Sequence, residues 1–418
     1  MHVLVMGAGV VGVTTAWYLR QAGHDVTVVD RQPRAGIETS YANGGQISVS
    51  HAEPWANPSA PFKVLKWLSQ PDAPLLFKLK LDPAQWIWGL KFLTQCTSKR
   101  AAWNIRQMVN LGTYSRTQLQ ALRKDQKLDY DHLEKGILHF YTNEKEFDAA
   151  REPTRIMQDL GCDRQVIGAD RALELEPALK PIASRIAGAT YTKEDESGDA
   201  RKFTQELAKK AEAAGVEFLY DTEVVGFENT RDRILGVGII SPDGCHRTLR
   251  MDSYVLSMGS YSAHFARKLG FFLNIYPAKG YSITAPVKNE EAAFQVSLTD
   301  DEYKLVYSRL GDRLRIAGTA ELGGYDRDLS LVRCQAIVRR AAEIMPEGAY
   351  WDQCEFWAGL RPATPSNVPY IGKSPLTNLY LNTGHGTLGW THSCGSAAAL
   401  ADVVSGRTPE LDFDFTGL

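Results

Sequence analysis

Three glycines near the amino terminus have the spacing of a phosphate-binding loop. Gly7, Gly9 and Gly12 form a G-x-G-x-x-G pattern, with Val10 and Val11 inside it. An expected strand at 3–6 precedes the pattern and an expected helix follows it. Gly7 would allow the tight turn, Gly9 would let backbone N–H groups approach a pyrophosphate, and Gly12 would let the helix pack on the strand. The positive end of the helix dipole would face the phosphates. This context predicts a dinucleotide-binding βαβ unit; a βαβ turn without a ligand is the alternative.

A second strand, at 26–29, ends on an acidic residue. Asp30 follows Gly12 by 18 residues, which is the position from which a carboxylate accepts hydrogen bonds from a ribose. We therefore count Asp30 and the adjoining Arg31 among the candidate cofactor-binding residues.

Two further loops could enclose a flat ring system. The first is polar and contains adjacent glycines; its candidate residues are Thr39, Ser40, Asn43, Gly44, Gly45 and Gln46. The second lies between a strand and a helix and lacks the G-x-G-x-x-G spacing; its candidate residues are Gly384, Gly386, Thr387, Leu388, Gly389, Trp390 and Thr391. A helix that points its amino end at a flavin would stabilise the negative charge of the reduced ring.

The elements that must position these loops form two domains of different kinds. Strands near Val224 and at 252–256, the latter leaving through Gly259, restart the nucleotide-binding sheet. Residues 275–360 alternate like antiparallel strands. The fold class expected is α/β with an α+β second domain. A discontinuous Rossmann-like FAD-binding domain would comprise 1–50, 150–265 and 365–418, and a mostly antiparallel substrate-binding domain would comprise 104–149 and 266–364.

Composition excludes several classes of protein. The 418 residues are 44% hydrophobic and 23% charged, as in ordinary globular proteins. Lys and Arg total 47 against 49 Asp and Glu, so no overall basic field would hold nucleic acid. The six cysteines lack C-x-x-C or zinc-ligand spacing, so no metal site is expected. Neither a signal peptide nor a membrane-spanning run is visible, and we expect a location on the cytoplasmic side.

Residues 55–103 depart from this neutral balance. Between Pro54 and Trp103 there are seven basic and two acidic residues, a net charge of +5, and five of the nine tryptophans. Tryptophan favours the membrane–water interface, and basic amphipathic helices lie on anionic lipid. The segment is interpreted as an insertion that either docks peripherally on the inner membrane or forms a packed helical lid.

Several motifs together resemble the glycine oxidase / D-amino acid oxidase superfamily of FAD enzymes. Within it the chain is most similar to the bacterial D-amino acid dehydrogenases of the small-subunit type. The resemblance extends nearly from end to end and is carried by residues 5–13, 39–46, 276–282, 359–365 and 382–390, which read VMGAGVVGV, TSYANGGQ, YPAKGYS, GLRPATP and NTGHGTLGW.

The resemblance implies noncovalent FAD, with the flavin between the 39–46 and 384–391 loops. It also implies that Arg361, in the Gly-Leu-Arg-Pro motif, holds the substrate carboxylate, for which a guanidinium is well matched. Tyr281 and Tyr303 could donate to the same carboxylate or simply pack in strands. His385 faces the flavin or satisfies the local backbone, and His51 and Gln46 are lesser candidates.

The activity implied is oxidative deamination of a D-amino acid to a 2-oxo acid and ammonia. Hydride would pass from Cα to flavin N5, a step that requires a neutral amine and alignment rather than a strong base. Electrons would then go to a quinone or the respiratory chain. Alternatives are oxygen as acceptor, a secondary amine such as sarcosine, proline or hydroxyproline as substrate, or a flavin-carrying subunit without turnover. A nicotinamide-dependent reductase is disfavoured because residues 235–241 lack the third glycine of a second dinucleotide site.

Overall fold

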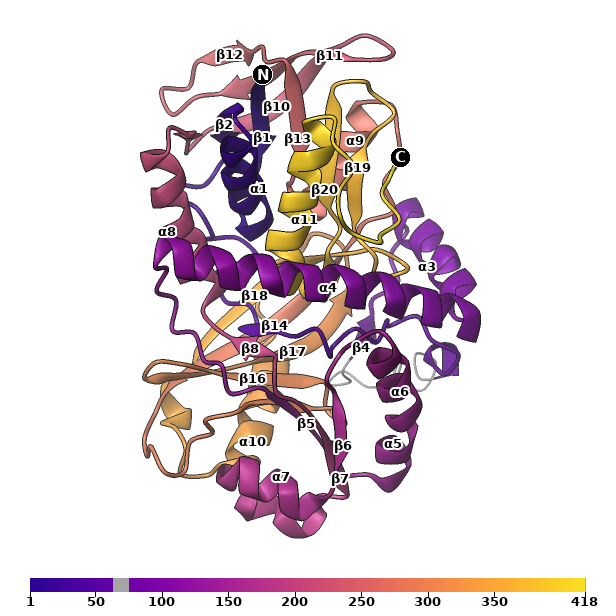
Figure 1. Ribbon diagram of the computed structural model, residues 1–418, viewed down its shortest axis with the longest axis vertical. Helices are drawn as coiled ribbons and strands as arrows, with labels where there is room; N and C mark the ends of the chain where they lie inside the picture. The colour runs from indigo at the N-terminus through magenta and orange to yellow at the C-terminus, as the bar shows by residue number, and fades with distance from the viewer. Residues whose placement is uncertain (63–74, 418) are drawn as a thin grey trace.

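The computed structural model describes residues 1–62 and 75–417, and these form two halves that meet along the long helix α4 (Figure 1). The upper half contains a six-stranded sheet in the order β19-β20-β13-β1-β2-β9. The bounds of these strands are β1 (His2–Met6), β2 (Asp25–Val29), β9 (Glu217–Leu219), β13 (Ser253–Leu256), β19 (Tyr370–Lys373) and β20 (Leu379–Thr383). Only β19 runs antiparallel to its neighbour.

This sheet is the expected Rossmann-like domain. Its strands are almost wholly buried, as expected for parallel strands covered on both faces. The helices of this half are α1 (Val10–Gln21), α8 (Ala200–Ala213), α9 (Ser262–Lys268) and α11 (Gly389–Val404). Helix α1 packs on α8 and on α11, so the two ends of the chain share one core. A separate antiparallel sheet consists of β10 (Glu223–Asn229), β11 (Ile234–Ile240) and β12 (His246–Leu249).

The lower half is built on a nine-stranded, mostly antiparallel sheet, as expected for the second domain. Eight strands follow the order β18-β14-β17-β16-β15-β5-β7-β6, and β4 pairs with β17. Their bounds are β4 (Leu75–Phe77), β5 (Ile137–Tyr141), β6 (Gln165–Ile167), β7 (Gly188–Thr192), β14 (Tyr276–Pro286), β15 (Ser297–Asp300), β16 (Leu305–Leu310), β17 (Arg313–Leu322) and β18 (Glu355–Ala363). Two of the pairings, β15 with β5 and β17 with β4, are parallel.

Helices cover the edges and one face of this sheet (Figure 1). They are α3 (Pro83–Gln95), α4 (Ser98–Gln126), α5 (Glu144–Ala149), α6 (Arg151–Asp159), α7 (Ala169–Leu175) and α10 (Leu331–Ile344). A short ribbon of β3 (Gln46–Ile47) and β8 (Glu196–Ser197) connects the halves. The 3₁₀ helices are Pro177–Arg185, Gly259–Tyr261, Trp351–Gln353 and Gly386–Leu388.

One boundary differs from the sequence interpretation. The strands β6 and β7 fall within 150–265, which we expected in the FAD-binding domain, yet β7 pairs antiparallel with β5 in the nine-stranded sheet. Phe140 lies opposite Ala189 in this pairing, and both are fully buried. A short apolar strand fits either sheet, and only the long-range partner decides which one it joins.

Part of the insertion at 55–103 is a helix with two unlike faces. The inner face of α3 buries Trp88 and Phe92 against Tyr276 and Leu322, and the Trp88 indole N–H donates to the Ala363 carbonyl at 2.8 Å. The outer face exposes apolar side chains. Lys63, Lys66, Trp67 and Asp72, which contributed to the expected charge pattern, lie outside the described residues.

Candidate active site and FAD-binding cavity

One cavity of about 740 Å³ runs from the glycine loop after β1 to the face of the nine-stranded sheet. Nearly all the cofactor-binding candidates line it: Gly7, Gly9, Val10, Val11, Asp30, Arg31, Thr39, Ser40, Asn43, Gly44, Gly45, Gln46, Val224, Gly259, Gly384, Gly386, Thr387, Leu388, Gly389, Trp390 and Thr391. Gly12 is the exception. The fold therefore gathers at one cavity residues that are almost 400 positions apart in sequence.

The first glycine turn has the close packing that its spacing requires. Gly7 has a φ of +107°, and a Cβ there would lie 2.6 Å from the Ser257 carbonyl oxygen. A Cβ on Gly12 would lie 1.8 Å from the Gly7 carbonyl oxygen. Gly12 thus permits α1 to pack against the turn and does not itself reach the cavity. The amino end of α1 faces the cavity at Gly9, Val10 and Val11, where it can hold a pyrophosphate.

Asp30 and Arg31 lie at the same end of the cavity. The Asp30 carboxylate accepts the backbone N–H of Ala8 at 2.6 Å and that of Gln32 at 2.8 Å. Burial raises its pKa although these two bonds oppose the shift. Arg31 pairs with Glu38 at 2.8 Å and covers the Tyr261 ring. The backbone bonds fix the Asp30 carboxylate, and each of its oxygens keeps a lone pair for a ribose hydroxyl.

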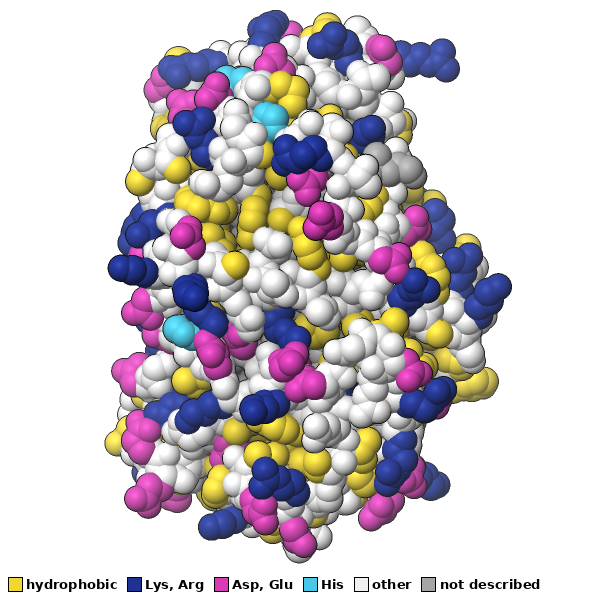
Figure 2. Space-filling view, viewed as in Figure 1, with side chains coloured by type: hydrophobic (Ala, Val, Ile, Leu, Met, Phe, Trp, Pro, Cys, Tyr) yellow, Lys and Arg dark blue, Asp and Glu magenta, His cyan; other side chains and the backbone are white. Residues whose placement is uncertain are grey.

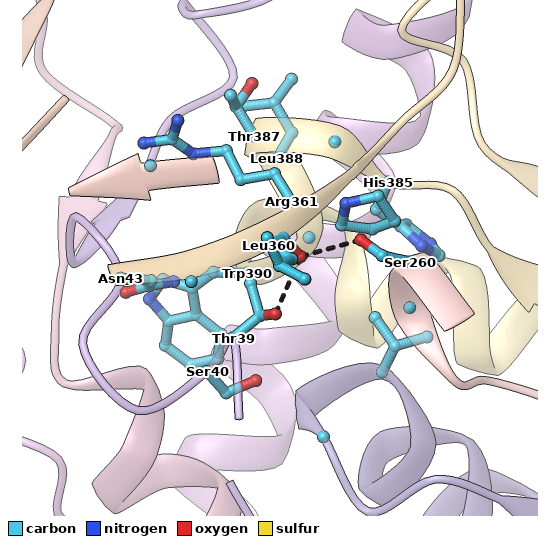
Figure 3. Close-up of a pocket in the computed structure, with 18 of the residues that line it drawn as sticks. Thr39, Ser40, Asn43, Ser260, Leu360, Arg361, His385, Thr387, Leu388 and Trp390 are labelled. Atoms are coloured by element: carbon cyan, nitrogen blue, oxygen red, sulfur yellow. Dashed lines mark hydrogen bonds between the residues drawn. The ribbon is translucent and has the colours of Figure 1, made fainter. Parts of the chain in front are cut away.

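The polar loop after β2 is tied to both domains. The Ser40 hydroxyl accepts the Val10 N–H at 3.1 Å. The hydroxyls of Thr39 and Ser260 both donate to the Leu360 carbonyl at 3.0 Å (Figure 3). These bonds hold the strand that carries Arg361 against the FAD-binding half. The Gln46 side-chain amide has a structural role, since it donates to the Leu298 carbonyl at 3.0 Å and the Ser297 hydroxyl at 3.1 Å.

A buried carboxylate that the sequence did not reveal anchors the continuation of this loop. Asp195 accepts the backbone N–H groups of Val49 and Ser50 and the hydroxyls of Ser48 and Ser50. Arg116 donates to the same carboxylate. Because Asp195 is fully buried, these five donors replace the water that it would otherwise need. His51 follows this anchored segment and lines the cavity.

Arg361 enters the cavity as a partly buried cation. Its guanidinium lies against Gly280, where any Cβ would come within 2.3 Å of Cζ. Nη1 donates to the Thr319 carbonyl at 2.6 Å and Nη2 lies 3.4 Å from the Gly318 carbonyl. Among the described residues no carboxylate pairs with it. Desolvation of the guanidinium, together with the nearby Arg333, lowers the pKa of Arg361 to about 10. A cation shielded from water without a counter-charge is a site for an anion.

The backbone that receives Arg361 is strained. Thr319 has a φ of +52°, and the pairing of β14 with β17 shifts register between Lys279 and Tyr281. This is a bulge on β17, since Thr319 and Ala320 lie opposite the single residue Gly280. It places the Thr319 carbonyl within reach of Arg361. Positive φ at a β-branched residue is typical of functional sites.

The two tyrosine candidates lie in different places. Tyr281 lines the cavity, but its hydroxyl donates to Glu321 at 2.9 Å, and burial with this neighbour raises its pKa to about 12. The single hydroxyl hydrogen is therefore directed away from a substrate carboxylate. Tyr303 lies outside the cavity lining, 42% exposed, with Arg340 stacked 4.0 Å from its ring centroid. The expectation for Tyr303 fails because the turn after β15 points its ring to the surface side.

His385 lies in the carboxyl-terminal glycine loop and is 2% exposed. Its Nε2 is 3.2 Å from the Ser396 hydroxyl, within the first turns of α11. Burial lowers its pKa to about 3, so the imidazole is neutral at physiological pH. The His385 side chain therefore lines the cavity and also forms a local bond to the Ser396 side chain.

The far end of the cavity contains a polar cluster of which sequence reasoning named only His51. His51, His139, Thr299, Asp301 and Lys304 line it together. A single histidine inside the apolar strand at 137–141 and the Asp-Asp pair at 300–301 were the available signals. Neither is informative alone, because the two segments are about 160 positions apart.

The arrangement fits a bound FAD. Within the described part of the chain, no group of three or more His, Cys, Asp or Glu side chains could hold a metal ion. A helix amino end, a fixed carboxylate and a glycine turn too close-packed for any Cβ meet the demands of a bound dinucleotide. The FAD dependent oxidoreductase family matches residues 2–403. The chain belongs to this family. It is therefore an FAD-dependent oxidoreductase, as the motifs indicated.

Curated relatives extend this assignment over the full length. A D-amino acid dehydrogenase of Dechloromonas aromatica is 55% identical over 99% of both chains. Another, of Paramagnetospirillum magneticum, is 51% identical over 100% of this chain and 98% of its own. The expected resemblance to bacterial D-amino acid dehydrogenases is confirmed.

Solved structures show the same fold at much lower identity. Glycine oxidase from Geobacillus kaustophilus superposes with a TM-score of 0.76 at 23% identity, over 100% of this chain and 98% of that one. L-proline dehydrogenase from P. horikoshii has a TM-score of 0.77 at 17% identity, over 98% and 95%. These two enzymes differ in substrate, so the shared fold leaves the substrate open.

Proposed function

We propose that this enzyme oxidatively deaminates D-amino acids to 2-oxo acids and ammonia. The observation that carries the proposal is Arg361, a partly buried cation in the cavity that, within the described part of the chain, bonds to carbonyls and to no carboxylate. A planar carboxylate is its natural counter-ion. The relatives named D-amino acid dehydrogenase, 55% and 51% identical, support the same substrate class.

In this proposal FAD binds noncovalently along the cavity. The amino end of α1 would hold its pyrophosphate, and Asp30 would hold its ribose. The 39–46 loop and the 384–391 loop would enclose its ring. When bound, FAD supplies the chemistry by accepting a hydride from the amino acid Cα, and water then converts the imine to the oxo acid and ammonia.

The chain's own residues bind and orient the substrate. Arg361 holds the carboxylate and thereby fixes the position of Cα. The two bonds to Leu360 keep the Arg361 strand in register with the FAD-binding half. Neutral His385 and the amino end of α11 line the other wall; the helix dipole there favours negative charge on a reduced ring.

For the electron acceptor we propose a membrane quinone, reached by docking of the outer face of α3 on anionic lipid. That face exposes Trp86, Ile87, Leu90 and Leu93, and the preceding turn exposes Leu79 and Leu81. Lys80, Lys91, Lys99 and Arg100 are exposed around them. Figure 2 shows apolar and basic side chains intermixed along the edge of the molecule that α3 forms in Figure 1. Such a mixture is typical of interfacial helices. Among the described residues, no helix is both long and apolar enough to cross a membrane.

Anaerobic reduction of the flavin tests the proposal. The purified holoenzyme is mixed with D-alanine, other D-amino acids, their L-enantiomers, sarcosine and D- and L-proline, and bleaching of the flavin absorbance is followed. We expect D-amino acids to bleach the flavin and the others to do so far more slowly. Faster reduction by sarcosine or proline would replace the primary-amine assignment with a secondary-amine one. Absence of reduction by every amine would refute the function.

The acceptor is tested separately. Reoxidation of the reduced enzyme is timed with oxygen, with measurement of hydrogen peroxide, and with a soluble quinone. Faster reoxidation by the quinone is expected. Faster reoxidation by oxygen would make the protein an oxidase.

A further inference from the structure

The cavity floor carries a row of side chains that runs across six strands. Register places Trp357, Ser282, Ala317, Val306, Thr299 and His139 opposite one another on β18, β14, β17, β16, β15 and β5. Residues directly opposite in adjacent strands point to the same face, and all of the row except Ser282 line the cavity. The row therefore gives the order of surfaces that a ligand on this face meets.

The surface along this row binds an anionic group at one end, is apolar in the middle and is polar at the other end. Arg361 reaches over Gly280 to the carbonyls of β17. Ala317 and Val306 follow, and Thr299 and His139 come last. His139 on β5 is three strands from β17, which is about 14 Å at the usual strand spacing. Side chains at both ends shorten this distance. An amino acid held by its carboxylate on Arg361 would thus direct its side chain toward His139.

His139 presents an unpaired ring nitrogen at that end. Its Nδ1 lies 3.1 Å from Asp301 Oδ2. An ionised carboxylate only accepts, so Nδ1 donates the shared hydrogen, and Nε2 is the ring atom left to bond to a ligand. His139 is 3% exposed, and Nε2 has no hydrogen-bond partner among the described residues. A buried polar atom of this kind costs free energy until a hydrogen-bonding partner meets it.

Asp301 holds the ring in this state. Burial opposes its ionisation, yet Lys304 and His139 hold the pKa of Asp301 well below its usual range. Lys304 Nζ is 2.8 Å from Asp301 Oδ1. The acidic partner therefore stays ionised and fixes which ring nitrogen of His139 carries the hydrogen.

The charges around His139 cancel. Asp301 pairs with Lys304, and Glu53 pairs with Arg164 at 3.1 Å. His51, whose ring centroid is 5.7 Å from that of His139, has its pKa lowered to about 3 by burial and by its basic neighbours. These two pairs leave no unpaired counter-charge for a cation or anion on the substrate, whereas a neutral hydrogen-bonding group would give Nε2 a partner.

We infer that His139, held by Asp301, forms a side-chain subsite for amino acids with an uncharged hydrogen-bonding group, a hydroxyl or a primary amide. The inference rests on the proposed function. It goes beyond it by naming a substrate preference and the residues that set it. His139 acts by direct contact with the substrate, and Asp301 acts as a positioning residue.

Isosteric substrate pairs test the subsite. D-Asparagine and D-leucine are similar in size, as are D-threonine and D-valine, and only the first of each pair can hydrogen-bond through its side chain. We expect kcat/KM for anaerobic flavin reduction to be about tenfold higher for the polar member of each pair, because a lost bond leaves Nε2 unpaired. His139→Leu should lower this ratio about tenfold. His139→Gln, which keeps a hydrogen-bonding side chain, should retain part of it.

Controls separate the subsite from folding and from turnover. His246→Leu makes the same change on exposed β12 and should leave the ratio at its wild-type value. Asp301→Asn retains His139 but removes the fixed tautomer, and should lower the ratio even if His139→Leu does not fold. Dissociation constants from amino-acid titrations of the flavin absorbance give the same ratio without turnover. An enzyme that no amino acid reduces would refute the proposed function while the binding ratio still decides the subsite.

Two results would overturn the inference. One is a wild-type ratio at or below one for both pairs. The other is an equal loss for D-asparagine, D-leucine and D-alanine in His139→Leu, which would assign His139 to proton transfer from the substrate amine rather than to side-chain recognition.

Discussion

The guanidinium of Arg361 on β18 donates to the carbonyl of Thr319, a residue held at a φ of +52° by a bulge in its own strand, β17. Among the described residues Arg361 bonds only to carbonyls, so its positive charge has no acidic partner at this partly buried position. The strained backbone thus orients the cation, while its counter-charge is left to a ligand.

Replacement of Arg361 should weaken the enzyme chiefly through substrate binding. Arg361→Leu removes the partly buried cation that we propose pairs with the substrate carboxylate, and such losses are of order 2–5 kcal/mol. We expect kcat/KM for D-alanine to fall on the order of 10²–10³-fold, with most of the change in KM, as measured by anaerobic flavin reduction. Arg247→Leu, an exposed arginine on β12, is the matched control. An unchanged KM in Arg361→Leu would contradict the carboxylate role.

A methyl group at Gly12 should prevent FAD retention. The added Cβ would lie 1.8 Å from the Gly7 carbonyl, and backbone cannot yield as a flexible side chain does. We expect Gly12→Ala to be purified with little flavin and to unfold at a lower temperature. Gly226→Ala, where a Cβ meets nothing within 4 Å, should retain both properties. Flavin-to-protein absorbance ratios and thermal melts would show this, and full flavin content in Gly12→Ala would count against the packing argument.

Acid should destabilise the protein through buried neutral histidines. His392 is 1% exposed, and burial lowers its pKa from 6.5 to about 3. Below pH 6.5 His392 binds a proton in the unfolded chain but not in the folded one, so the free energy of unfolding falls as the pH falls toward 3. His392 alone should contribute a loss of about 2 kcal/mol between pH 7 and pH 5.

Denaturant unfolding of the holoenzyme at both pH values measures this loss. His392→Gln should reduce the decline in the free energy of unfolding, and His246→Gln, at an exposed position, should not. Parallel declines in all three proteins would show that other groups cause the acid sensitivity.

Charge reversal on α3 should release the protein from lipid. Leu90 and Lys91 lie on its exposed face. Leu90→Glu with Lys91→Glu therefore removes apolar surface that would enter the lipid and adds repulsion from anionic headgroups. We expect wild type to sediment with phosphatidylglycerol-containing vesicles and the double variant to remain in the supernatant. Reduction by D-alanine serves as the check on folding, and exposed Leu235→Glu with Arg247→Glu on the three-stranded sheet is the matched control. Equal sedimentation of wild type and the α3 variant would refute docking.

The sequence by itself determined the parts whose geometry is local. Gly7, Gly9, Gly12 and Asp30 lie within one βαβ unit, so spacing alone predicted their arrangement, including the helix packing that Gly12 permits. The motif around Arg361 was informative through resemblance, and the structure places that residue in the cavity as a cation without an acidic partner among the described residues.

Only the tertiary structure decided which distant segments meet. Strand register brings His139 opposite Thr299 and next to Asp301, and it assigns β6 and β7 to the second sheet. The tertiary structure also places Tyr303 outside the cavity lining, and it brings Glu321 to the Tyr281 hydroxyl, which donates to it. A strand's apolar pattern specifies which face is buried but not which strand lies beside it. The arginine proposed to bind the carboxylate could therefore be predicted from a motif. The His139–Asp301 pair could not, because these two residues meet only through the pairing of β5 with β15.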